Sequence, residues 1–294
     1  MESVSGPRGP VQEELVLSLD CDEQPGIVHA VSGLLLERGC DIVESRQFDD
    51  RRRGRFFMRL QVAPAAEGVD RAALEAGLAE LSGRIGMRWR LREASRRTRV
   101  LIMVSRFGHC LNDLLYRARS GELPIEVVAV VSNHLDHQGL VGWHSVPYFH
   151  VPVTPESKPE AEARLLELAN RFDAELIVLA RYMQVLSDEL SARLAGRCIN
   201  IHHSFLPSFK GAKPYHQAWE RGVKLVGATA HYVDEHLDEG PIIAQRVIPV
   251  DHAAEPEDLV AIGRDAEVAA LTDAVRMHCE DRVFLHGART VILR

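Results

Sequence analysis

The residues best suited to chemistry in this sequence are an asparagine, a histidine and an aspartate in its C-terminal half. Asn200 and His202 stand two apart in an apolar, extended segment, so their side chains face the same side of it. Asp238 belongs to a later loop whose terminal Gly240 allows a sharp turn. An amide N–H can stabilise an oxyanion, and a histidine paired with a carboxylate can move protons near neutral pH. Because the set has no side-chain nucleophile, it predicts a reaction with water or a small molecule as acceptor.

Other interpretations compete for the same region, where five of the chain's fourteen histidines lie between positions 202 and 236. A shared metal is disfavoured, because adjacent His202 and His203 are expected to point to opposite sides of an extended strand and no HExxH or CxxC motif accompanies them. A Ser-His-Asp hydrolase is disfavoured because there is no GxSxG nucleophile elbow. A structural role, in which Asn200 and Asp238 cap turns and the histidines pack, fits the spacing as well as catalysis does.

The composition narrows the class of protein. The 294 residues are 46% hydrophobic and 26% charged, which is typical of globular domains. A net charge of −7 argues against a broad nucleic-acid or anionic-membrane surface, and no apolar run is long enough to span a bilayer. Five scattered cysteines without CxxC spacing and an N-terminus without the apolar core of a signal peptide predict a protein of the reducing cytoplasm.

A small domain is expected to precede these residues, at 12–93. Alternating apolar positions and turn residues predict the order βαββαβ, which folds as a ferredoxin-like antiparallel sheet with two helices on one face. The polar segment 93–99 then breaks the pattern. The predicted strands cover 14–20, 41–48, 55–62 and 87–92, and the predicted helices cover 27–39 and 70–85.

The second domain is expected at 99–294 and must position the candidate residues. The short runs 100–104, 126–131 and 176–180 are almost wholly apolar, as in strands that are buried on both faces. Helical segments at 110–119 and 159–172 separate them, so a Rossmann-like parallel sheet covered by helices is predicted. Sites in such sheets lie in the loops that follow the strands.

The first domain resembles the ACT domain, a small ligand-sensing module. The resemblance rests on the order of the elements and on the DxxPG turn after the first strand, which contains Gln24, Pro25 and Gly26. It implies that these three residues bind an effector, glycine or methionine, in a homo-oligomer whose ACT domains pair. The alternative is a ferredoxin-like packing domain without a ligand.

The second domain resembles the formyltransferase domain that uses 10-formyltetrahydrofolate. Residues 200–211 (NIHHSFLPSFKG) and the segment from His231 to Ile243 carry the resemblance. It implies a catalytic triad of Asn200, His202 and Asp238, with no metal and no added cofactor. It also implies a pterin pocket built from the segment 181–187 and the loop 234–237. The substrate-binding residues expected from it are Met183, Gln184, Leu186, His203, Asp234, Glu235, His236 and Leu237.

Three kinds of formyltransferase-like enzyme compete. Glycinamide ribonucleotide transformylases hold a phosphate in a Gly-rich loop, whereas the equivalent residues 105–111 (SRFGHCL) contain one glycine. Methionyl-tRNA formyltransferases have the opposite domain order and a basic RNA-binding domain. The string 204–218 (SFLPSFKGAKPYHQA), the string GRFFMR at 54–59 and His203, where transformylases usually have proline, are similar to formyltetrahydrofolate deformylases.

The sequence is therefore identified as a member of the deformylase family, which implies hydrolysis of 10-formyltetrahydrofolate to tetrahydrofolate and formate. The implied roles are general base and acid for His202, oxyanion stabilisation for Asn200 and orientation of the imidazole for Asp238. Lys210 and Lys213 either contact the glutamate tail of the folate or are solvated. Two alternatives stay open, namely formyl transfer to glycinamide ribonucleotide and a non-catalytic regulator that binds folate or an amino acid.

Overall fold

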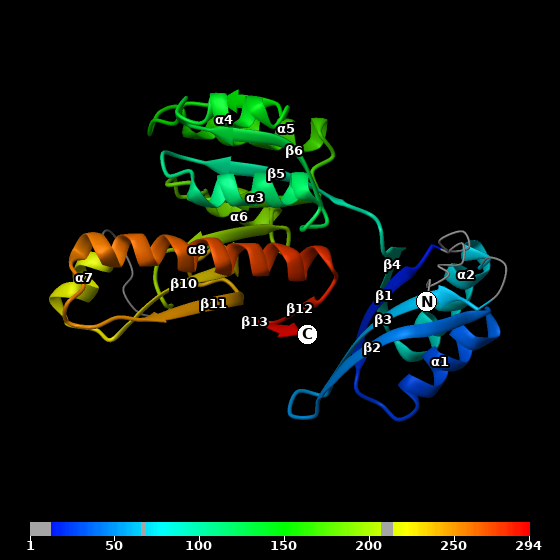
Figure 1. Cartoon of the computed structure of the whole chain (residues 1–294). Helices are drawn as coiled ribbons and strands as arrows, with labels where there is room; N and C mark the ends of the chain where they lie inside the picture. The colour runs from blue at the N-terminus through cyan, green and yellow to red at the C-terminus, as the bar shows by residue number, and fades with distance from the viewer. Residues whose placement is uncertain (1–12, 66–68, 207–213) are drawn as a thin grey trace, which may run out of the picture. The chain divides into compact units, whose positions relative to one another are not determined.

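The computed structural model describes residues 13–65, 69–206 and 214–294. The chain divides into two compact units (Figure 1): one extends to Arg96 and includes Leu293 and Arg294, and the other covers Arg97–Ile292. Residue 12, Lys210 and Lys213 lie outside the described residues. Among the described helices, none is long and apolar enough to cross a membrane.

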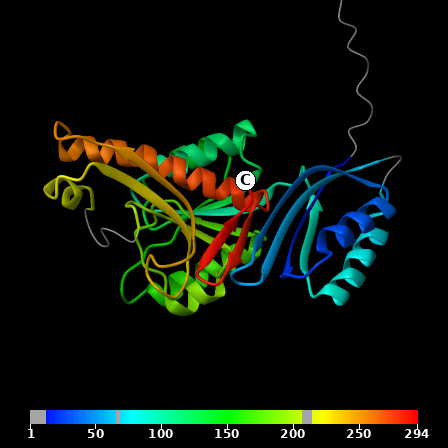
Figure 2. The same ribbon diagram turned by 90° about the horizontal axis from the view of Figure 1, so that it is seen from below.

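The first unit is an antiparallel sheet of four strands in the order β2-β3-β1-β4, with both helices on one face (Figure 2). The helices α1 and α2 bury leucines and other apolar side chains at helical spacing against the sheet. This is the predicted ferredoxin-like βαββαβ fold, which is confirmed. The elements are β1 (Leu15–Asp22), α1 (Ile27–Glu37), β2 (Cys40–Asp50), β3 (Arg55–Pro64), α2 (Arg71–Ile85) and β4 (Arg88–Glu93).

The second unit is built on a sheet of seven strands in the order β11-β10-β9-β8-β5-β6-β7. Strands β5 to β9 are parallel, as predicted. The strands are β5 (Thr98–Val104), β6 (Ile125–Ser132), β7 (Tyr148–His150), β8 (Leu176–Leu179), β9 (Cys198–His202), β10 (Leu225–Tyr232) and β11 (Ile242–Pro249). The helices are α3 (His109–Ser120), α4 (Gln138–Trp143), α5 (Lys158–Arg171), α6 (Asp188–Arg193), α7 (Pro214–Glu220) and α8 (Pro256–Cys279).

Two strands at one edge depart from the expected all-parallel sheet. β10 runs antiparallel to β9, and β11 runs antiparallel to β10. The loop between β10 and β11 is too short for the crossover that parallel neighbours need, so the chain turns back on itself. A small hairpin of β12 (Val283–His286) and β13 (Arg289–Ile292) follows α8.

The sheet is covered on both faces, which explains its nearly continuous apolar strands. In β5, Val100 and Ile102 face a core that includes side chains of α3 and α8, whereas Leu101 and Met103 face a core that includes α5 and α6. Alternation of side chains along the strand thus sends neighbours into two cores.

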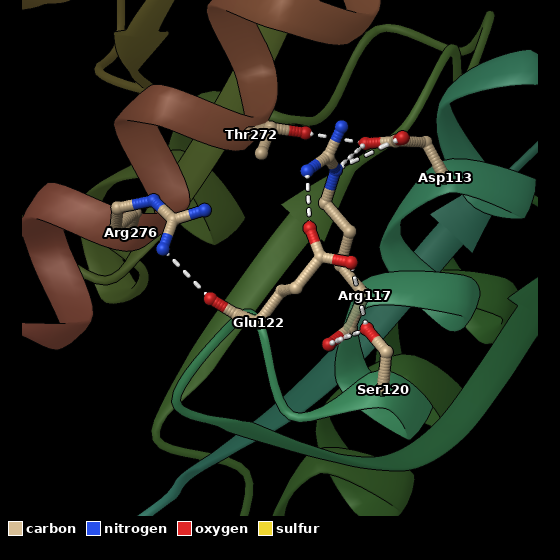
Figure 3. A network of polar contacts seen from close by, with 6 residues as sticks. All are labelled: Asp113, Arg117, Ser120, Glu122, Thr272 and Arg276. Carbon is tan, nitrogen blue, oxygen red and sulfur yellow. Dashed lines mark hydrogen bonds and ion pairs between the residues drawn. The ribbon is translucent and has the colours of Figure 1, made fainter.

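A polar network fixes α8 on α3 (Figure 3). The Arg117 Nε–H donates to both carboxylate oxygens of Asp113, at 3.0 and 2.8 Å, and the Thr272 hydroxyl donates to the same carboxylate at 2.6 Å. Nearby, Arg276 donates to the backbone oxygen of Glu122 at 2.7 Å. The bond from Thr272 joins α8 to α3 and the bond from Arg276 joins α8 to the turn after α3, so together they set the register of α8 along α3.

Candidate active site

A cavity of about 660 Å³ lies beyond the carboxyl ends of β8 and β9, where sites in such sheets are expected. Its volume suits a substrate of cofactor size. All the catalytic and substrate-binding residues predicted from the sequence line it, together with residues from the start of α3 and from α8. The predicted residues are Met183, Gln184, Leu186, Asn200, His202, His203, Asp234, Glu235, His236, Leu237 and Asp238.

Asn200, His202 and Asp238 meet in this cavity. The His202 Nδ1 lies 3.2 Å from the Asp238 Oδ2, and the Asn200 amide donates to the Asp238 Oδ1 at 3.4 Å. Asn200 and His202 reach the same carboxylate because they stand two apart in β9 and face the same side. The sequence-based expectation of their common face agrees with this geometry.

The loop that carries Asp238 depends on its particular sequence. Asp238 has a left-handed backbone with φ of 56°, which costs energy for any residue with a side chain but least for Asp and Asn. Two residues later, a Cβ on Gly240 would lie 1.8 Å from the backbone oxygen of Tyr232, so only glycine fits there. The Tyr232 N–H donates to the Pro241 carbonyl at 2.9 Å and closes the loop. Asp238 is therefore held in place by a tight backbone turn.

The charge on Asp238 decides which ring nitrogen of His202 carries a proton. Burial by itself would raise the pKa of Asp238, but hydrogen bonds to His202 and His231, and the positive charge that these imidazoles carry when protonated, hold that pKa well below its usual range. Asp238 is thus ionised and accepts, so the Nδ1 of His202 carries a proton. The Nε2 of His202 is buried and has no hydrogen-bond partner among the described residues. Its free lone pair is positioned to accept a proton from a bound molecule.

His231 is a fourth member of the site that the sequence-based residue set lacks. Its side chain is buried, and its Nδ1–H donates to the Tyr232 carbonyl oxygen at 2.8 Å. Its Nε2 lies 3.3 Å from the Asn200 amide nitrogen and 3.7 Å from the Asp238 Oδ1. Sequence reasoning missed His231 because its place depends on strand pairing. β10 sets His231 directly opposite Asn200 of β9, in an antiparallel register that the sequence did not predict.

The expectation that His202 and His203 point to opposite sides is wrong. β9 ends at His202 and the chain bends at His203, so the alternation of a strand no longer applies. Their ring centroids are 5.2 Å apart, and both side chains line the cavity. Burial, the positive charge of Arg181 and that of His202 lower the pKa of His203 to about 4. His203 is therefore a neutral imidazole at physiological pH.

The predicted pterin segment after β8 is held by two serines. Ser105, at the end of β5, accepts the Met183 N–H at 2.9 Å and donates to the Asn133 side chain at 2.7 Å. Ser187 caps α6, and its backbone N–H donates to Glu162 at 2.8 Å. These bonds fix both ends of the segment. The backbone that carries its cavity-lining side chains is therefore held in place by the protein itself.

A charged cluster on the other side of the cavity was not predicted from the sequence. Glu267 of α8 is 2% exposed, and its carboxylate lies 2.8 Å from the His109 Nε2 and 3.3 Å from the Arg181 Nε. His109, Arg181 and Glu267 all line the cavity. Sequence reasoning could not group these three residues, because they are far apart in the chain and only the packing of α3, α8 and the end of β8 brings them together.

The same cluster contains the one group of candidate metal ligands found among the described residues. The ligand atoms of His109, Cys110 and Glu267 lie within 4.8 Å of one another. Burial raises the pKa of the Cys110 thiol well above its usual range, which disfavours the thiolate that binds metals. The guanidinium of Arg181 beside Glu267 also opposes a cation there.

The predicted effector residues lie in the first unit, at the turn before α1. Gly26 has a φ of 92° and precedes the first residue of the helix. The Gln24 side chain donates to the Ile85 carbonyl oxygen at 2.9 Å, which ties this turn to the end of α2. Pro25 stands between them in the same turn.

Comparison with known proteins identifies the family. Residues 98–275 match the family described as "Formyl transferase". A formyltetrahydrofolate deformylase of Corynebacterium sp. (strain P-1) is 60% identical over 279 residues, which are 95% of this chain and 98% of that protein. The chain belongs to the formyltetrahydrofolate deformylase family.

Solved structures agree with membership of the deformylase family. The crystal structure of a formyltetrahydrofolate deformylase from Pseudomonas putida KT2440 superposes with a TM-score of 0.91 at 52% identity, covering 96% of this chain and 100% of that one. A glycinamide ribonucleotide transformylase from Symbiobacterium toebii reaches a TM-score of 0.63 at 32% identity and covers 70% of this chain and 98% of that one. Likeness to the deformylase thus extends over nearly the whole chain.

Proposed function

We propose that this chain hydrolyses 10-formyltetrahydrofolate with water to give tetrahydrofolate and formate. One observation carries the catalytic part of the proposal. The His202 Nε2 is a buried, unpartnered base among the described residues, and the ionised Asp238 fixes its tautomer from the other side of the ring. Such a histidine can take a proton from water without a covalent enzyme intermediate. Family membership supplies the substrate.

In the proposed mechanism, a water molecule attacks the formyl carbon while its proton passes to the Nε2 of His202. A C–O bond forms, and the formyl oxygen becomes the oxyanion of a tetrahedral intermediate. Collapse breaks the bond from the formyl carbon to N10, and the proton on His202 returns to N10. Formic acid leaves and ionises to formate at neutral pH, so every proton is accounted for.

Asn200 is proposed to stabilise that oxyanion. Its two amide hydrogens are directed at Asp238 and His231 over 3.4 and 3.3 Å, which is longer than the 2.9 Å or so of a strong N–H···O bond. An oxyanion at a shorter distance can therefore displace one of these partners at small cost. His231 is proposed to orient the amide, because its own Nδ1–H is fixed on the Tyr232 carbonyl.

The folate is proposed to bind along the wall formed by the segment after β8 and the loop after β10. Met183 and Leu237 line the cavity although they are 52% and 63% exposed, so they offer apolar surface to a planar ring. In the loop, the His236 N–H donates to Asp234 at 2.9 Å and shapes the backbone that faces the cavity. Gln184, Leu186, Glu235 and His203 complete the proposed set.

Transfer of the formyl group to an organic amine fits this cavity less well than hydrolysis does. The loop after β5 carries the side chains of Phe107 and His109, and both line the cavity. A Cβ on the loop's glycine, Gly108, would lie 2.5 Å from the ring of His137. This stretch thus presents a phenyl ring and an imidazole to the cavity, whereas a phosphate-binding loop presents backbone N–H groups.

The setting of the activity is also proposed. The ACT-like first unit is proposed to bind glycine or methionine at Gln24, Pro25 and Gly26 and to pair in a homo-oligomer. All five cysteines are free and buried, in keeping with a cytoplasmic enzyme. The reaction as written needs no metal or added cofactor, returns tetrahydrofolate to the one-carbon pool and supplies formate for processes such as purine synthesis.

Formate release without an added acceptor tests the proposal. Purified full-length protein is incubated with 10-formyltetrahydrofolate, and formate and tetrahydrofolate are quantified together, with and without glycine, methionine or glycinamide ribonucleotide. Equal amounts of both products without an acceptor are expected. Strict dependence on the ribonucleotide would assign transfer instead, and folate binding without turnover would assign the regulator.

A further inference from the structure

Arg181 is a buried cation in the catalytic cavity that the proposed mechanism does not use. It is 9% exposed, and its guanidinium makes two contacts with the described residues. Its Nε lies 3.3 Å from Glu267 without the geometry of a hydrogen bond, and its Cζ lies 5.5 Å from the ring centroid of Phe107. The fork of the guanidinium therefore has no hydrogen-bond partner among the described residues.

The backbone holds Arg181 in this place at an energetic cost. Its φ of 65° lies in the left-handed region, which is unfavourable for a long side chain. Ser105 compensates, because its N–H donates to the Arg181 carbonyl at 3.2 Å and its hydroxyl accepts the N–H of Met183. A strained residue fixed at the edge of a cavity is typical of a functional position.

The surroundings of Arg181 connect it with the reacting atoms. Arg181, Glu267, His202 and Asp238 all act electrostatically on His203, and all five residues line the same cavity. The rings of His202 and His203 are 5.2 Å apart, and Arg181 lines the same cavity as both. An anion beside His202 is thus within the field of the guanidinium.

We propose that Arg181 is the binding residue for the carboxylate of formate, the one-carbon product, in the catalytic cavity. This inference rests on the proposed function, since hydrolysis is what makes formate a product. A guanidinium fork matches the two oxygens of a carboxylate, and formate is small enough to lie beside His203 and the bound folate. Glu267, which also lies 2.8 Å from the His109 Nε2, faces the Nε of Arg181 at 3.3 Å, so the terminal nitrogens of the fork are left for the ligand.

Titration of the full-length protein with ¹³C-labelled sodium formate tests this without turnover. Broadening of the formate NMR signal is measured in the absence of folate, with sodium chloride at equal ionic strength as reference. Arg181→Met is expected to weaken formate binding by roughly tenfold or more, the loss typical of a charge-assisted hydrogen-bonded pair. Arg181→Lys keeps the charge and loses the fork, so its affinity for formate is expected to lie between that of the unsubstituted protein and that of Arg181→Met.

Matched variants keep the result interpretable. Arg264→Met removes a cation from the rim of the same cavity and is expected to change formate affinity less than about twofold. If Arg181→Met does not fold because Glu267 loses the charge of the guanidinium beside it, the double variant Arg181→Met with Glu267→Gln removes both charges, and Glu267→Gln alone is its reference. The same loss of at least about tenfold is expected between these two.

Two outcomes separate this proposal from the proposed function. Formate affinity in Arg181→Met equal to that of the unsubstituted protein overturns the formate site, and makes Arg181 only the counter-ion of Glu267, even if formate release is normal. A protein that releases no formate from 10-formyltetrahydrofolate overturns the proposed function, whatever the titration shows.

Discussion

Replacing Asp238 by asparagine tests the proton-transfer mechanism most directly. The ionised carboxylate now accepts from the Nδ1 of His202 at 3.2 Å, which leaves the Nε2 as the free base. An asparagine amide can donate to Nδ1 instead, and the imidazole proton then moves to Nε2. The base would face the substrate in the wrong tautomer, and the imidazolium formed during the reaction would lose its counter-charge.

The expected loss follows from these two effects. General-base catalysis by a positioned side chain is worth about 10² to 10⁴ in rate, and a wrong tautomer in a histidine–carboxylate pair removes most of it. We therefore expect Asp238→Asn to lower kcat by roughly 10³ to 10⁴, equivalent to about 4 to 5 kcal/mol of activation free energy. KM is expected to change only a few-fold, because the substitution preserves the shape of the side chain.

Acceptor-free formate release under saturating 10-formyltetrahydrofolate measures this change. Asp251→Asn is the matched control, because the Asp251 carboxylate also accepts a hydrogen bond, here from the Ala253 N–H at 2.9 Å, but lies in an exposed turn that does not line the cavity. Its kcat is expected to stay within about twofold of the unsubstituted protein. A kcat for Asp238→Asn within about tenfold of normal would refute the assignment of His202 as a base whose tautomer Asp238 sets.

Three further predictions follow from the same geometry. Asn200→Ala is expected to lower kcat by roughly 10² to 10³ while the Kd for tetrahydrofolate, measured by fluorescence titration, stays within a few-fold; a normal kcat would contradict the oxyanion role. The fold lowers the pKa of His203 to about 4, so its imidazole stays neutral in the folded protein at higher pH. In the unfolded chain the same imidazole binds a proton below about pH 6.5. The free energy of unfolding is therefore expected to fall as the pH drops from about 6.5 to about 4. His203→Gln should flatten this dependence in urea unfolding, and an unchanged slope would contradict the shift. Gly240→Ala places a Cβ 1.8 Å from the Tyr232 oxygen, so both Tm and kcat are expected to fall, and neither would change if the loop could relax freely.

The sequence was sufficient for the local structure of those elements that carry a clear periodicity. The alternating residues of β1 and β3 and the continuous apolar run of β5 differ for a physical reason, since the first two lie in a sheet covered by helices on one face and the last lies in a sheet covered on both. The spacing of Asn200 and His202 predicted a shared face by the same logic. These predictions needed no knowledge of distant contacts.

The rest of the site depends on contacts that no local pattern encodes. His231 joins Asn200 through an antiparallel pairing of β9 with β10, which requires the order of strands in the sheet. Glu267 and His109 stand 158 residues apart and meet only because α8 packs on α3. The same docking is fixed by Thr272 and Asp113, five and four residues further along the two helices. The local pattern predicted the helix α3 but not which of its residues face α8.

Backbone strain gives an independent indication of where function lies in the second unit. Five described residues other than glycine have a positive φ, and three of them, Ser145, Asp173 and Asp281, each follow directly the C-cap of a helix. A left-handed residue there ends the helix and satisfies its last carbonyls, so those positions need no functional explanation. Arg181 and Asp238 end no helix, and both line the cavity. In both, the unfavourable backbone places a charged side chain at the cavity, with the carboxylate against His202 and the guanidinium against Glu267. The turn at Gly240 and the bonds of Ser105 stabilise these two conformations. Part of the favourable free energy of folding therefore offsets the backbone strain that places two opposite charges at the cavity of His202 and His203.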